Sequence, residues 1–311
     1  MFNLSKKELQ IIHELETNAR QNLSTIAKKC KLSKETVNYH IKKLESLGVI
    51  KEYFTLINRN TLGLSTYRIY IKQKKLDAKI GKEILDFLRA DPNIWVLGKT
   101  SGEFDFAVGI STSNDYEFGN FTEELMNKFS SEIQTLQTQL LLEYNENTRE
   151  YLTNEPKKTI SVLESAKKVD YDKKDLLILD ALKRTARISS SKIAKKIGLS
   201  ERQVRYRIKR MEREKIIVAY RCNIDYRKLG YNYYKIDLWL EDRKNIRKIR
   251  KFVNTLPQTV YSERTVYYSD VEFDIEVKGT QELLDTVQHI AKVFPNTLKE
   301  FKYYTMLEFY K

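Results

Sequence analysis

Residues 24–63 read STIAKKCKLSKETVNYHIKKLESLGVIKEYFTLINRNTLG, and residues 191–230 read SKIAKKIGLSERQVRYRIKRMEREKIIVAYRCNIDYRKLG. With an offset of 167 positions, Lys6–Ile71 aligns with Lys173–Leu238 without a gap, and 26 of the 66 pairs are identical. Chance similarity between lysine-rich helices does not produce an ungapped match of that length. The chain therefore contains a duplication of one long unit, unlike the many short repeats of a solenoid.

Each copy begins with a pattern that predicts three helices followed by a strand. In the first copy, Lys6–Leu15 carries its apolar residues on one helical face. Ser24 is the expected N-cap of a short second helix, and Ser33 is the expected N-cap of a third helix over Lys34–Leu47. Gly48 is the expected end of that helix, and the apolar stretch after it predicts the first strand of a wing. This order indicates a winged helix-turn-helix.

The third helix of the second copy follows the same scheme. Ser200 and Gln203 fit a capping box, and Val204, Ile208 and Met211 recur at helical spacing and are expected to face inward. The other side chains of this helix face outward, where a helix in the major groove contacts base edges and phosphates. The predicted DNA-binding residues of both copies are Ser24, Lys34, Thr36, Asn38, Tyr39, His40, Lys42, Lys43, Ser191, Arg202, Gln203, Arg205, Tyr206, Arg207, Lys209 and Arg210. For the matched tyrosines, packing against the wing is an equally good alternative.

The charge is concentrated on these two segments. The chain has a formal net charge of +14. Residues 1–60 hold 11 basic and 6 acidic residues, residues 170–228 hold 18 and 8, and the rest holds 27 and 28. All the excess positive charge therefore lies on the two candidate reading units. Phosphate contacts supply most of the non-specific affinity for nucleic acid, so this distribution favours double-stranded DNA as a partner.

The later part of each copy predicts two helices and four strands in βαββαβ order, which is the ferredoxin-like arrangement of an antiparallel sheet with helices on one face. In the first copy the expected elements are Tyr67–Ile71, Ala78–Arg89, Trp95–Thr100, Phe104–Ser111, Asp115–Phe129 and Leu136–Tyr144. In the second copy they are Tyr234–Leu240, Asn245–Thr255, Val260–Tyr268, Phe273–Lys278, Thr280–Phe294 and Leu298–Tyr310.

The predicted fold class is therefore α+β, with two tandem copies of a winged helix-turn-helix plus a ferredoxin-like domain. The expected boundaries are 1–60 and 170–227 for the helix-turn-helix domains, 61–148 and 228–311 for the ferredoxin-like domains, and 149–169 for a polar linker. Within the linker region, Thr159–Leu163 is compatible with either a short strand or a helix.

The segment Leu15–Gly63 and its counterpart resemble the Lrp/AsnC, or feast/famine, family of prokaryotic transcription regulators. The helix-turn-helix, the GVI after it and the LG before the next domain carry the resemblance. The resemblance implies that the ferredoxin-like domain mediates dimerisation through its sheet and often binds a small effector such as an amino acid. Members usually have one unit per chain, so the fusion implies an intramolecular pseudo-dimer, with further homo-oligomers as an open alternative.

The resemblance also implies an effector site. The family's Gly-x-x-Asp signature between the second and third strands is matched by Gly102–Asp105, whereas the second copy has Val271–Asp274 at the position taken as equivalent and lacks the glycine. Glycine lets the backbone approach a ligand closely, but a tight strand connection explains the same motif. The predicted effector-binding residues are Gly98, Thr100, Ser101, Gly102 and Asp105.

Two other functions are compatible with this architecture. Siroheme decarboxylases share it and also occur as fused pairs, but they need histidines, and this chain has only His13, His40 and His289. The first two fall in the first reading unit and the third on a predicted sensor helix. No catalytic residue and no enzyme activity is therefore predicted. A non-specific architectural DNA-binding protein would differ only in its ratio of specific to non-specific affinity.

Other features narrow the chemistry. Cys30 and Cys222 lie far apart without a second cysteine nearby, which argues against a disulfide framework or a zinc site. No phosphate-binding glycine loop is present, so no cofactor or metal is predicted. The N-terminus lacks an apolar signal core and no run reaches eighteen apolar residues, which indicates a cytoplasmic protein with no membrane partner. The sequence thus predicts a sequence-specific transcription regulator with two non-identical DNA-reading heads in one chain.

Overall fold

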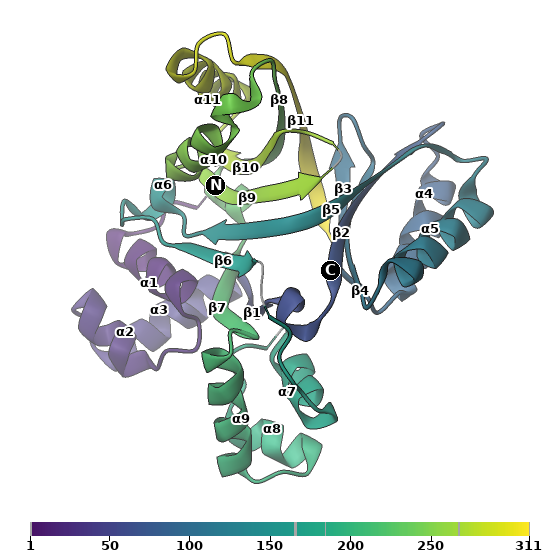
Figure 1. The fold of residues 1–311 in the computed structure, drawn as a ribbon. Coiled ribbons are helices and arrows are strands. Elements are labelled where there is room, and N and C mark those ends of the chain that lie inside the picture. Colours follow the sequence, from purple (N-terminus) through teal and green to yellow (C-terminus); the bar gives the residue numbers. More distant parts are fainter. Residues whose placement is uncertain (1, 165–166, 184, 267, 311) are drawn as a thin grey trace. The chain divides into compact units, whose positions relative to one another are not determined.

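The computed structural model describes residues 2–310 except 165–166, 184 and 267 (Figure 1). Its internal contacts divide the chain into two compact units. Unit 1 comprises residues 1–62, 145–162 and 168–232, and unit 2 comprises residues 63–144, 163–167 and 233–311. Each unit therefore joins the equivalent parts of both copies, and neither copy forms a compact body of its own.

Unit 1 contains the two predicted helix-turn-helix segments, and their element order is confirmed (Figure 1). Head one consists of α1 (Lys6–Thr17), α2 (Leu23–Cys30), α3 (Lys34–Ser46) and β1 (Ile50–Ile57). Head two consists of α7 (Lys173–Lys183), α8 (Ser190–Ile197), α9 (Glu201–Arg213) and β7 (Ile217–Ile224). Short 3₁₀ turns follow at Arg59–Leu62 and Tyr226–Leu229.

Side-chain caps fix where the helices of each head begin. Ser33 and Ser200 cap α3 and α9 as predicted. The prediction that Ser24 caps α2 is wrong, because the helix begins two residues earlier than that cap requires, at Leu23, and its N-cap is Asn22. The Asn22 side chain accepts hydrogen bonds from both the backbone amide (2.8 Å) and the hydroxyl (2.9 Å) of Thr25. Asparagine is as good an N-cap as serine, so sequence preference alone did not separate the two.

The third helix of each head is anchored by the apolar residues that the sequence pattern selects. Val204, Ile208 and Met211 of α9 are buried, as are their counterparts in α3. The core of head one also contains Cys222 and Ile224, which belong to β7 of the second copy. The two heads therefore share apolar packing, and this packing explains why they cluster into a single unit.

The strand predicted as the first strand of a wing pairs with its counterpart in the other copy and not with a neighbouring strand of its own head. β1 and β7 pair antiparallel with each other as a two-stranded ribbon, with Tyr53 opposite Cys222. A single strand has unpaired backbone groups along both edges, and pairing with its counterpart satisfies one edge of each. The wing of each head is thus replaced by one ribbon to which both copies contribute.

Two arginines and two tyrosines at equivalent positions repeat the same contact on both sides of this ribbon. The guanidinium of Arg20 lies 5.2 Å from the ring centroid of Tyr220, and that of Arg187 lies 5.2 Å from the ring centroid of Tyr53. Each pair is related to the other by the 167-residue offset of the duplication. The heads are therefore arranged about an approximate local two-fold axis.

The segment between the copies is ordered on head one. It forms α6 (Glu150–Thr153) and β6 (Thr159–Leu163), so the strand alternative applies to the latter. Arg221 of β7 is almost completely buried, and its Nε donates to Glu146 at 2.8 Å while its Nη1 donates to the carbonyl of Glu16 at 2.5 Å. Arg149 of the linker also pairs with Glu16 of α1, so the first part of the linker, up to residue 162, belongs to the folded structure of unit 1.

Unit 2 contains both predicted βαββαβ segments, and the α+β tandem fold is confirmed. The first copy contributes β2 (Ser65–Gln73), α4 (Ala78–Ala90), β3 (Ile94–Ser101), β4 (Phe106–Thr112), α5 (Asp115–Phe129) and β5 (Ile133–Asn147). The second contributes β8 (Asn232–Leu240), a 3₁₀ turn (Arg243–Asn245), α10 (Ile246–Thr255), β9 (Thr259–Val266), β10 (Val271–Val277), α11 (Thr280–Val293) and β11 (Leu298–Phe309).

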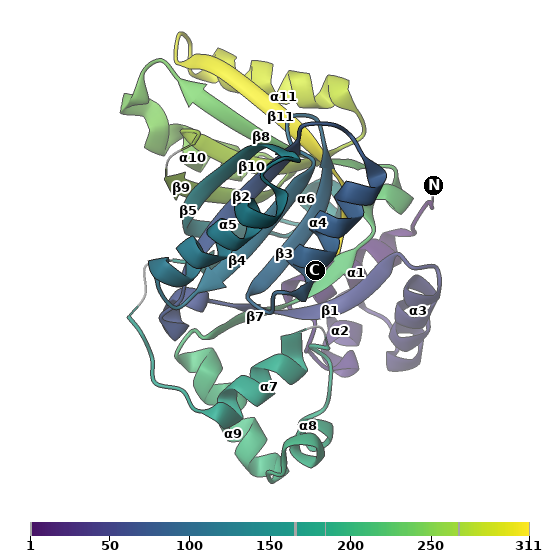
Figure 2. The same ribbon diagram turned by 90° about the vertical axis from the view of Figure 1, so that its right-hand side faces the viewer.

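The strands of both copies form one sheet in the order β2-β4-β3-β11-β8-β10-β9-β5-β6, and β2 also pairs with β5. This last pairing closes the sheet into a ring. The fourth strand of each copy lies beside the second strand of the other, as β11 beside β3 and β5 beside β9. The helices α4 and α5 cover the outer face of the strands of the first copy (Figure 2).

The inner face of this ring is polar. Strand alternation places Ile236 on the helix side and Lys235 on the other side, where it is buried. The Nζ of Lys235 lies 2.9 Å from Glu263, 3.2 Å from Glu272 and 3.5 Å from Asp274. These carboxylates are also buried, so the ring encloses a charged network rather than a second apolar core.

Candidate nucleic-acid interface

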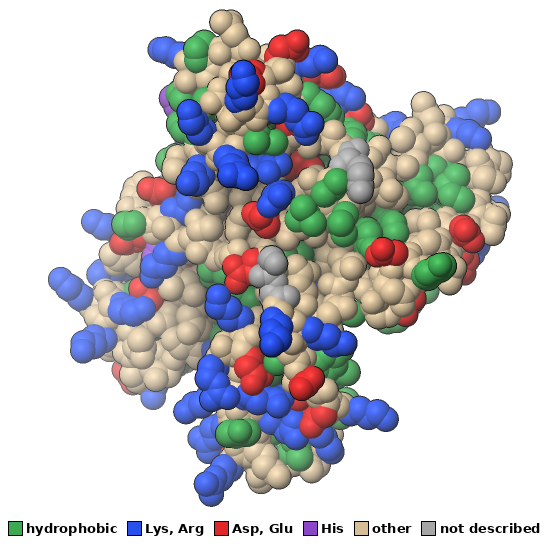
Figure 3. Space-filling view, in the orientation of Figure 1, with side chains coloured by type: hydrophobic (Ala, Val, Ile, Leu, Met, Phe, Trp, Pro, Cys, Tyr) green, Lys and Arg blue, Asp and Glu red, His purple; other side chains and the backbone are tan. Residues whose placement is uncertain are grey.

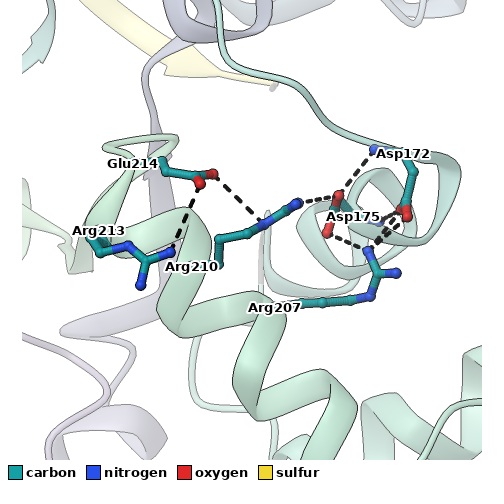
Figure 4. Close-up of polar contacts among 6 residues, drawn as sticks. All are labelled: Asp172, Asp175, Arg207, Arg210, Arg213 and Glu214. Atoms are coloured by element: carbon teal, nitrogen blue, oxygen red, sulfur yellow. Dashed lines mark hydrogen bonds and ion pairs between the residues drawn. The ribbon is translucent and has the colours of Figure 1, made fainter.

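A buried acid of the first helix binds two side chains of the third helix in each head. In head two this acid is Asp175, which is fully buried. Its carboxylate lies 2.9 Å from Arg207 and 2.5 Å from Arg210, and Asp172 lies 2.9 Å from Arg207 (Figure 4). The hydrogen bond that Arg207 donates to Asp175 raises the pKa of the Arg207 guanidinium above its ordinary value. Both arginines therefore face α7.

Head one repeats this arrangement with different residue types. Glu8 lies at the position equivalent to Asp175, and its carboxylate is 2.8 Å from Lys43 and 3.4 Å from His40. Burial by itself would raise the pKa of Glu8, but hydrogen bonds from Lys43 and Ser5 outweigh it and lower the pKa from 4.5 to about 2. The charged carboxylate therefore connects α1 to α3.

These contacts divide the sequence-predicted DNA-binding residues into two sets. His40, Lys43, Arg207 and Arg210 contact acidic residues of their own heads. A cation in such a pair reaches a phosphate only after leaving a buried carboxylate unpaired, which is costly. The geometry thus gives them a role in positioning the third helix, a role that the sequence pattern did not reveal.

Another face of each third helix is exposed. Spacings of three and four residues place one set of side chains on the side opposite the buried apolar residues. Tyr39 and Tyr206 lie in the middle of these faces and are 63% and 65% exposed, so neither packs against a wing. The reading stripe, as this set is called below, consists of Glu35, Asn38, Tyr39 and Lys42 in head one and Arg202, Arg205, Tyr206 and Lys209 in head two.

Other predicted residues belong to the beginnings of helices. The Thr36 and Ser33 hydroxyls are 3.0 Å apart, and the Gln203 side chain accepts from the backbone amide of Ser200 at 2.9 Å. Lys34 is exposed in the first turn of α3. Ser24 and Ser191 lie in the first turns of α2 and α8.

Basic side chains gather around α8 and α9 on the face drawn in Figure 3. Lys192 and Lys195 of α8 are exposed. They are absent from the sequence-based prediction, which took its basic candidates from the third helix of each copy and named only Ser24 and Ser191 on the second helices. The identity of Lys28 in the first copy and Lys195 in the second was the signal that was available.

The predicted effector residues form a tight connection between β3 and β4. Thr100 donates to the carbonyl of Phe104 at 2.6 Å, and the Asp105 carboxylate accepts from the backbone amide of Gln73 at 2.8 Å. Gly102 has φ +125°, and a Cβ there would lie 3.2 Å from that of Tyr304. The glycine is therefore required by backbone conformation and close packing.

The other two candidates have similar surroundings. A Cβ on Gly98 would collide with Met306 Cε at 2.0 Å, so Gly98 makes room for the neighbouring strand β11. Ser101 ends β3 opposite Thr305. The motif therefore supports the alternative of a tight strand connection, and the side chains of Thr100 and Asp105 have hydrogen-bond partners within unit 2.

The hydrogen bonds also correct the alignment of this motif between the copies. The Asp105 side chain accepts a hydrogen bond from the backbone amide of Gln73, and the backbone amide of Asp105 donates to the carbonyl of Ile71. In the second copy, the Asp270 side chain accepts from the backbone amide of Leu240, and the backbone amide of Asp270 donates to the carbonyl of Leu238. Leu238 and Leu240 correspond to Ile71 and Gln73 under the 167-residue offset. The counterpart of Asp105 is thus Asp270, and Val271–Asp274 lies on β10. Position 267, the counterpart of Gly102, lies outside the described residues.

The three histidines occupy separate local environments. His13 is buried, and its ring nitrogen lies 3.5 Å from the Thr153 hydroxyl of the linker. His289 of α11 packs against the ring of Phe252. Because His40 contacts Glu8, each histidine has its own protein neighbours, and the described residues bring no two of them together around one centre.

Two other kinds of feature are absent from the described residues. No helix there combines the length and apolar character needed to cross a membrane. No group of three or more histidine, cysteine or acidic side chains there is arranged to hold a metal ion.

The comparisons with known proteins fall on the same segments. A model of the winged helix-turn-helix DNA-binding family matches residues 4–51 and 171–218. The HTH-type transcriptional regulator FL11 of Pyrococcus horikoshii is 30% identical over 122 residues, which cover 39% of this chain and 78% of that protein. The regulator LrpA of the same organism is 43% identical over 65 residues, covering 21% of this chain and 46% of that protein.

A solved structure matches nearly the whole chain. The siroheme decarboxylase NirDL superposes with a TM-score of 0.66 and 10% identity, and the match covers 98% of this chain and 92% of that one. At this identity the likeness shows the fold alone, including its tandem arrangement. The sequence relatives are regulators, and the duplicated segments carry their motifs. This chain belongs to the Lrp/AsnC family of HTH-type transcriptional regulators, in a tandem-duplicated form.

Proposed function

We propose that this protein is a sequence-specific DNA-binding transcription regulator whose two heads read two unlike half-sites as an intramolecular pseudo-dimer. The observation that carries this proposal is the pair of exposed reading stripes on α3 and α9, held about a local two-fold axis by the β1–β7 ribbon. Two helices related in this way are suited to half-sites in opposite orientations, about one helical turn or a multiple apart.

The charge of unit 1 supports DNA as the partner. Residues 1–60 carry a net +5 and residues 170–228 a net +10. Cations near phosphates release counterions on binding, which makes the affinity strongly salt-dependent. The covalent connection between the heads also raises the effective concentration of the second head once the first is bound.

The two stripes differ in composition, which supports unlike half-sites. Head one presents Glu35 and Asn38 where head two presents Arg202 and Arg205. Their different hydrogen-bonding groups favour different base edges. Since both heads occur in one chain, each binding site would contain one half of each kind, and a palindrome would fit only one head well.

Selection of bound fragments from random double-stranded DNA tests this function. We expect an asymmetric consensus with two halves, together with protection of both halves in a footprint. A perfect palindrome would contradict unlike heads. Equal affinity for all sequences would instead indicate an architectural DNA-binding protein, because the ratio of specific to non-specific affinity separates the two.

The ferredoxin-like unit gives a reason to propose regulation by a small effector such as an amino acid. The family relationship supports effector binding, and we propose the connection at Gly98–Asp105 as the binding site. Gel-shift titrations with and without each amino acid would test it, and unchanged affinity with all of them would contradict it. We propose no enzymatic role, since the relatives in sequence are regulators and each histidine contacts neighbours of its own. An absorbance change on mixing with an iron porphyrin would contradict that view.

A further inference from the structure

The two reading stripes contain residues that are equivalent by the duplication, so each head is an internal control for the other. Tyr39 corresponds to Tyr206 and Lys42 to Lys209. Identical residues at equivalent positions do not distinguish two half-sites. A difference in specificity must therefore come from the positions at which the stripes differ, which are 35 with 202 and 38 with 205.

Several of the remaining differences between the third helices have other roles. Thr36 and Gln203 contribute to the caps at the starts of α3 and α9. His40 contacts Glu8, and its counterpart Arg207 contacts Asp175. These side chains are occupied within the heads, so their differences do not present different groups to a ligand.

Of the two differing positions, one changes the charge and the other changes the hydrogen-bonding pattern. Glu35 and Arg202 have opposite charges, and this difference acts on attraction to phosphate at any sequence. Asn38 and Arg205 lie one turn further along, in the N-terminal half of each helix. Asparagine forms two hydrogen bonds with the edge of adenine, whereas arginine forms two with guanine.

Both side chains are available. Asn38 is partly exposed. Among the described residues, Arg205 pairs with the exposed Glu201 of its own helix, at 3.0 Å, and 63% of the arginine side chain is accessible. Exposed pairs of this kind contribute little, so Arg205 is free to exchange this partner for a base.

We propose that positions 38 and 205 set the base preference of the two heads, with Asn38 selecting adenine in one half-site and Arg205 selecting guanine at the equivalent place in the other. This inference rests on the proposed function. Asn38 and Arg205 also differ by one unit of charge, so head two would bind with the stronger salt dependence of the two.

The test is a reciprocal exchange in the full chain, with Asn38→Arg, Arg205→Asn and the double exchange. Each protein is used to select from random double-stranded DNA. We expect Asn38→Arg to change the preferred base pair of one half-site from adenine to guanine, and Arg205→Asn to make the opposite change in the other. The double exchange should reverse the order of the two halves. One bidentate contact corresponds to a preference of about 5-fold to 150-fold.

Arg213→Asn is the matched control, because the same residue type lies in the last turn of α9, outside the reading stripe, and contacts Glu214 there. We expect this change to leave the preferred bases unaltered. Lys42→Ala and Lys209→Ala should weaken binding to all sequences alike. Asn38→Ala and Arg205→Ala should remove the preference at a single base pair, and they decide the question if an exchanged protein fails to fold.

The outcomes distinguish failure of the assignment of positions 38 and 205 from failure of the proposed function. If the unaltered protein selects a sequence and neither exchange nor alanine substitution changes a preferred base, the assignment of positions 38 and 205 is overturned while the proposed function stands. A base change caused by Arg213→Asn instead of Arg205→Asn also overturns it. If the unaltered protein selects no sequence, the proposed function fails, and this inference fails with it.

Discussion

Arg20 in head one and Arg187 in head two occupy equivalent positions, and each donates a hydrogen bond of 2.5 Å to an alanine carbonyl of the opposite head. The acceptors, Ala186 and Ala19, are themselves equivalent under the 167-residue offset. Two copies of one contact on the two sides of the ribbon fix the angle between the heads. The relative orientation of α3 and α9 is thus determined by contacts inside unit 1.

Replacing Arg20 with alanine should weaken this arrangement. The change removes hydrogen bonds to the carbonyls of Ala186 and Ile188, as well as the cation–π contact with Tyr220. We expect a loss of about 1–3 kcal/mol in the free energy of unfolding, measured by urea denaturation. Affinity for a two-half DNA site should fall more than affinity for one half. Arg213→Ala, at an exposed position, serves as the control and should change neither.

Acid should destabilise head one through Glu8. Its folded pKa of about 2 is lower than its ordinary 4.5. The contribution to stability is therefore complete above pH 4.5 and is lost as the pH falls toward 2. The contribution at neutral pH is on the order of 3 kcal/mol. Glu8→Gln should reduce stability at pH 7 and flatten its dependence between pH 5 and 2, as followed by thermal denaturation. A parallel decline in both proteins would contradict this role.

The charged network inside unit 2 should act in the opposite direction. Asp237 is 1% exposed, and its Oδ2 has no hydrogen-bond partner among the described residues. Burial, together with the nearby Glu272 carboxylate, raises its pKa well above 3.8, although Lys235 opposes the shift. A raised folded pKa means that stability is complete below the ordinary pKa and declines as the pH rises above it.

Asp237→Asn tests this sign because asparagine resembles the protonated carboxyl in shape and charge. We expect the variant to be more stable than the unaltered protein at pH 8 and to differ less from it at pH 4, in calorimetric scans. Glu143→Gln is a useful control, since that carboxylate pairs with Arg264 at the surface and should leave the pH dependence unchanged. If Asp237→Asn leaves the slope unaltered, the carboxylate is ionised throughout.

The glycine of the β3–β4 connection gives a further prediction about folding. Gly102→Ala forces a residue with a Cβ to adopt φ +125° and to approach Tyr304 at 3.2 Å. We expect a loss of about 1–3 kcal/mol in the free energy of unfolding. Gly119, in the middle of α5 with no atom within 4 Å of its ideal Cβ, is the matched control. There the same substitution should stabilise by about 0.5–1 kcal/mol.

The local elements could be predicted from the sequence because their signals are local. The expected Asp115–Phe129 coincides with α5, and Ser200 with Gln203 forms the expected capping box. Periodicity and capping depend on residues within a few positions of one another. The duplication was also visible, since it requires only comparison of the chain with itself.

Pairings between distant residues could not be predicted in the same way. No local feature of Ile50–Ile57 indicates that its partner is Ile217–Ile224 rather than a neighbouring hairpin strand. Arg207 and Arg210 were predicted from the sequence to be available for DNA, because their buried partner Asp175 lies on another helix. The sequence also aligned Asp105 with the wrong residue of the second copy. Its counterpart is Asp270, which makes the same hydrogen bonds although its spacing from the duplicated segment differs.

The exchange of strands in unit 2 has a consequence for how the chain folds during synthesis. β3 ends at Ser101, and its edge partner in β11 is Thr305. At 5–20 residues per second, a ribosome needs roughly 10–40 s to make the intervening chain. Throughout that interval the edge of β3 lacks its final neighbour and is open to other strands. Nascent chains are therefore expected to require protection by chaperones at this edge, and refolding should be slow because these contacts span most of the sequence.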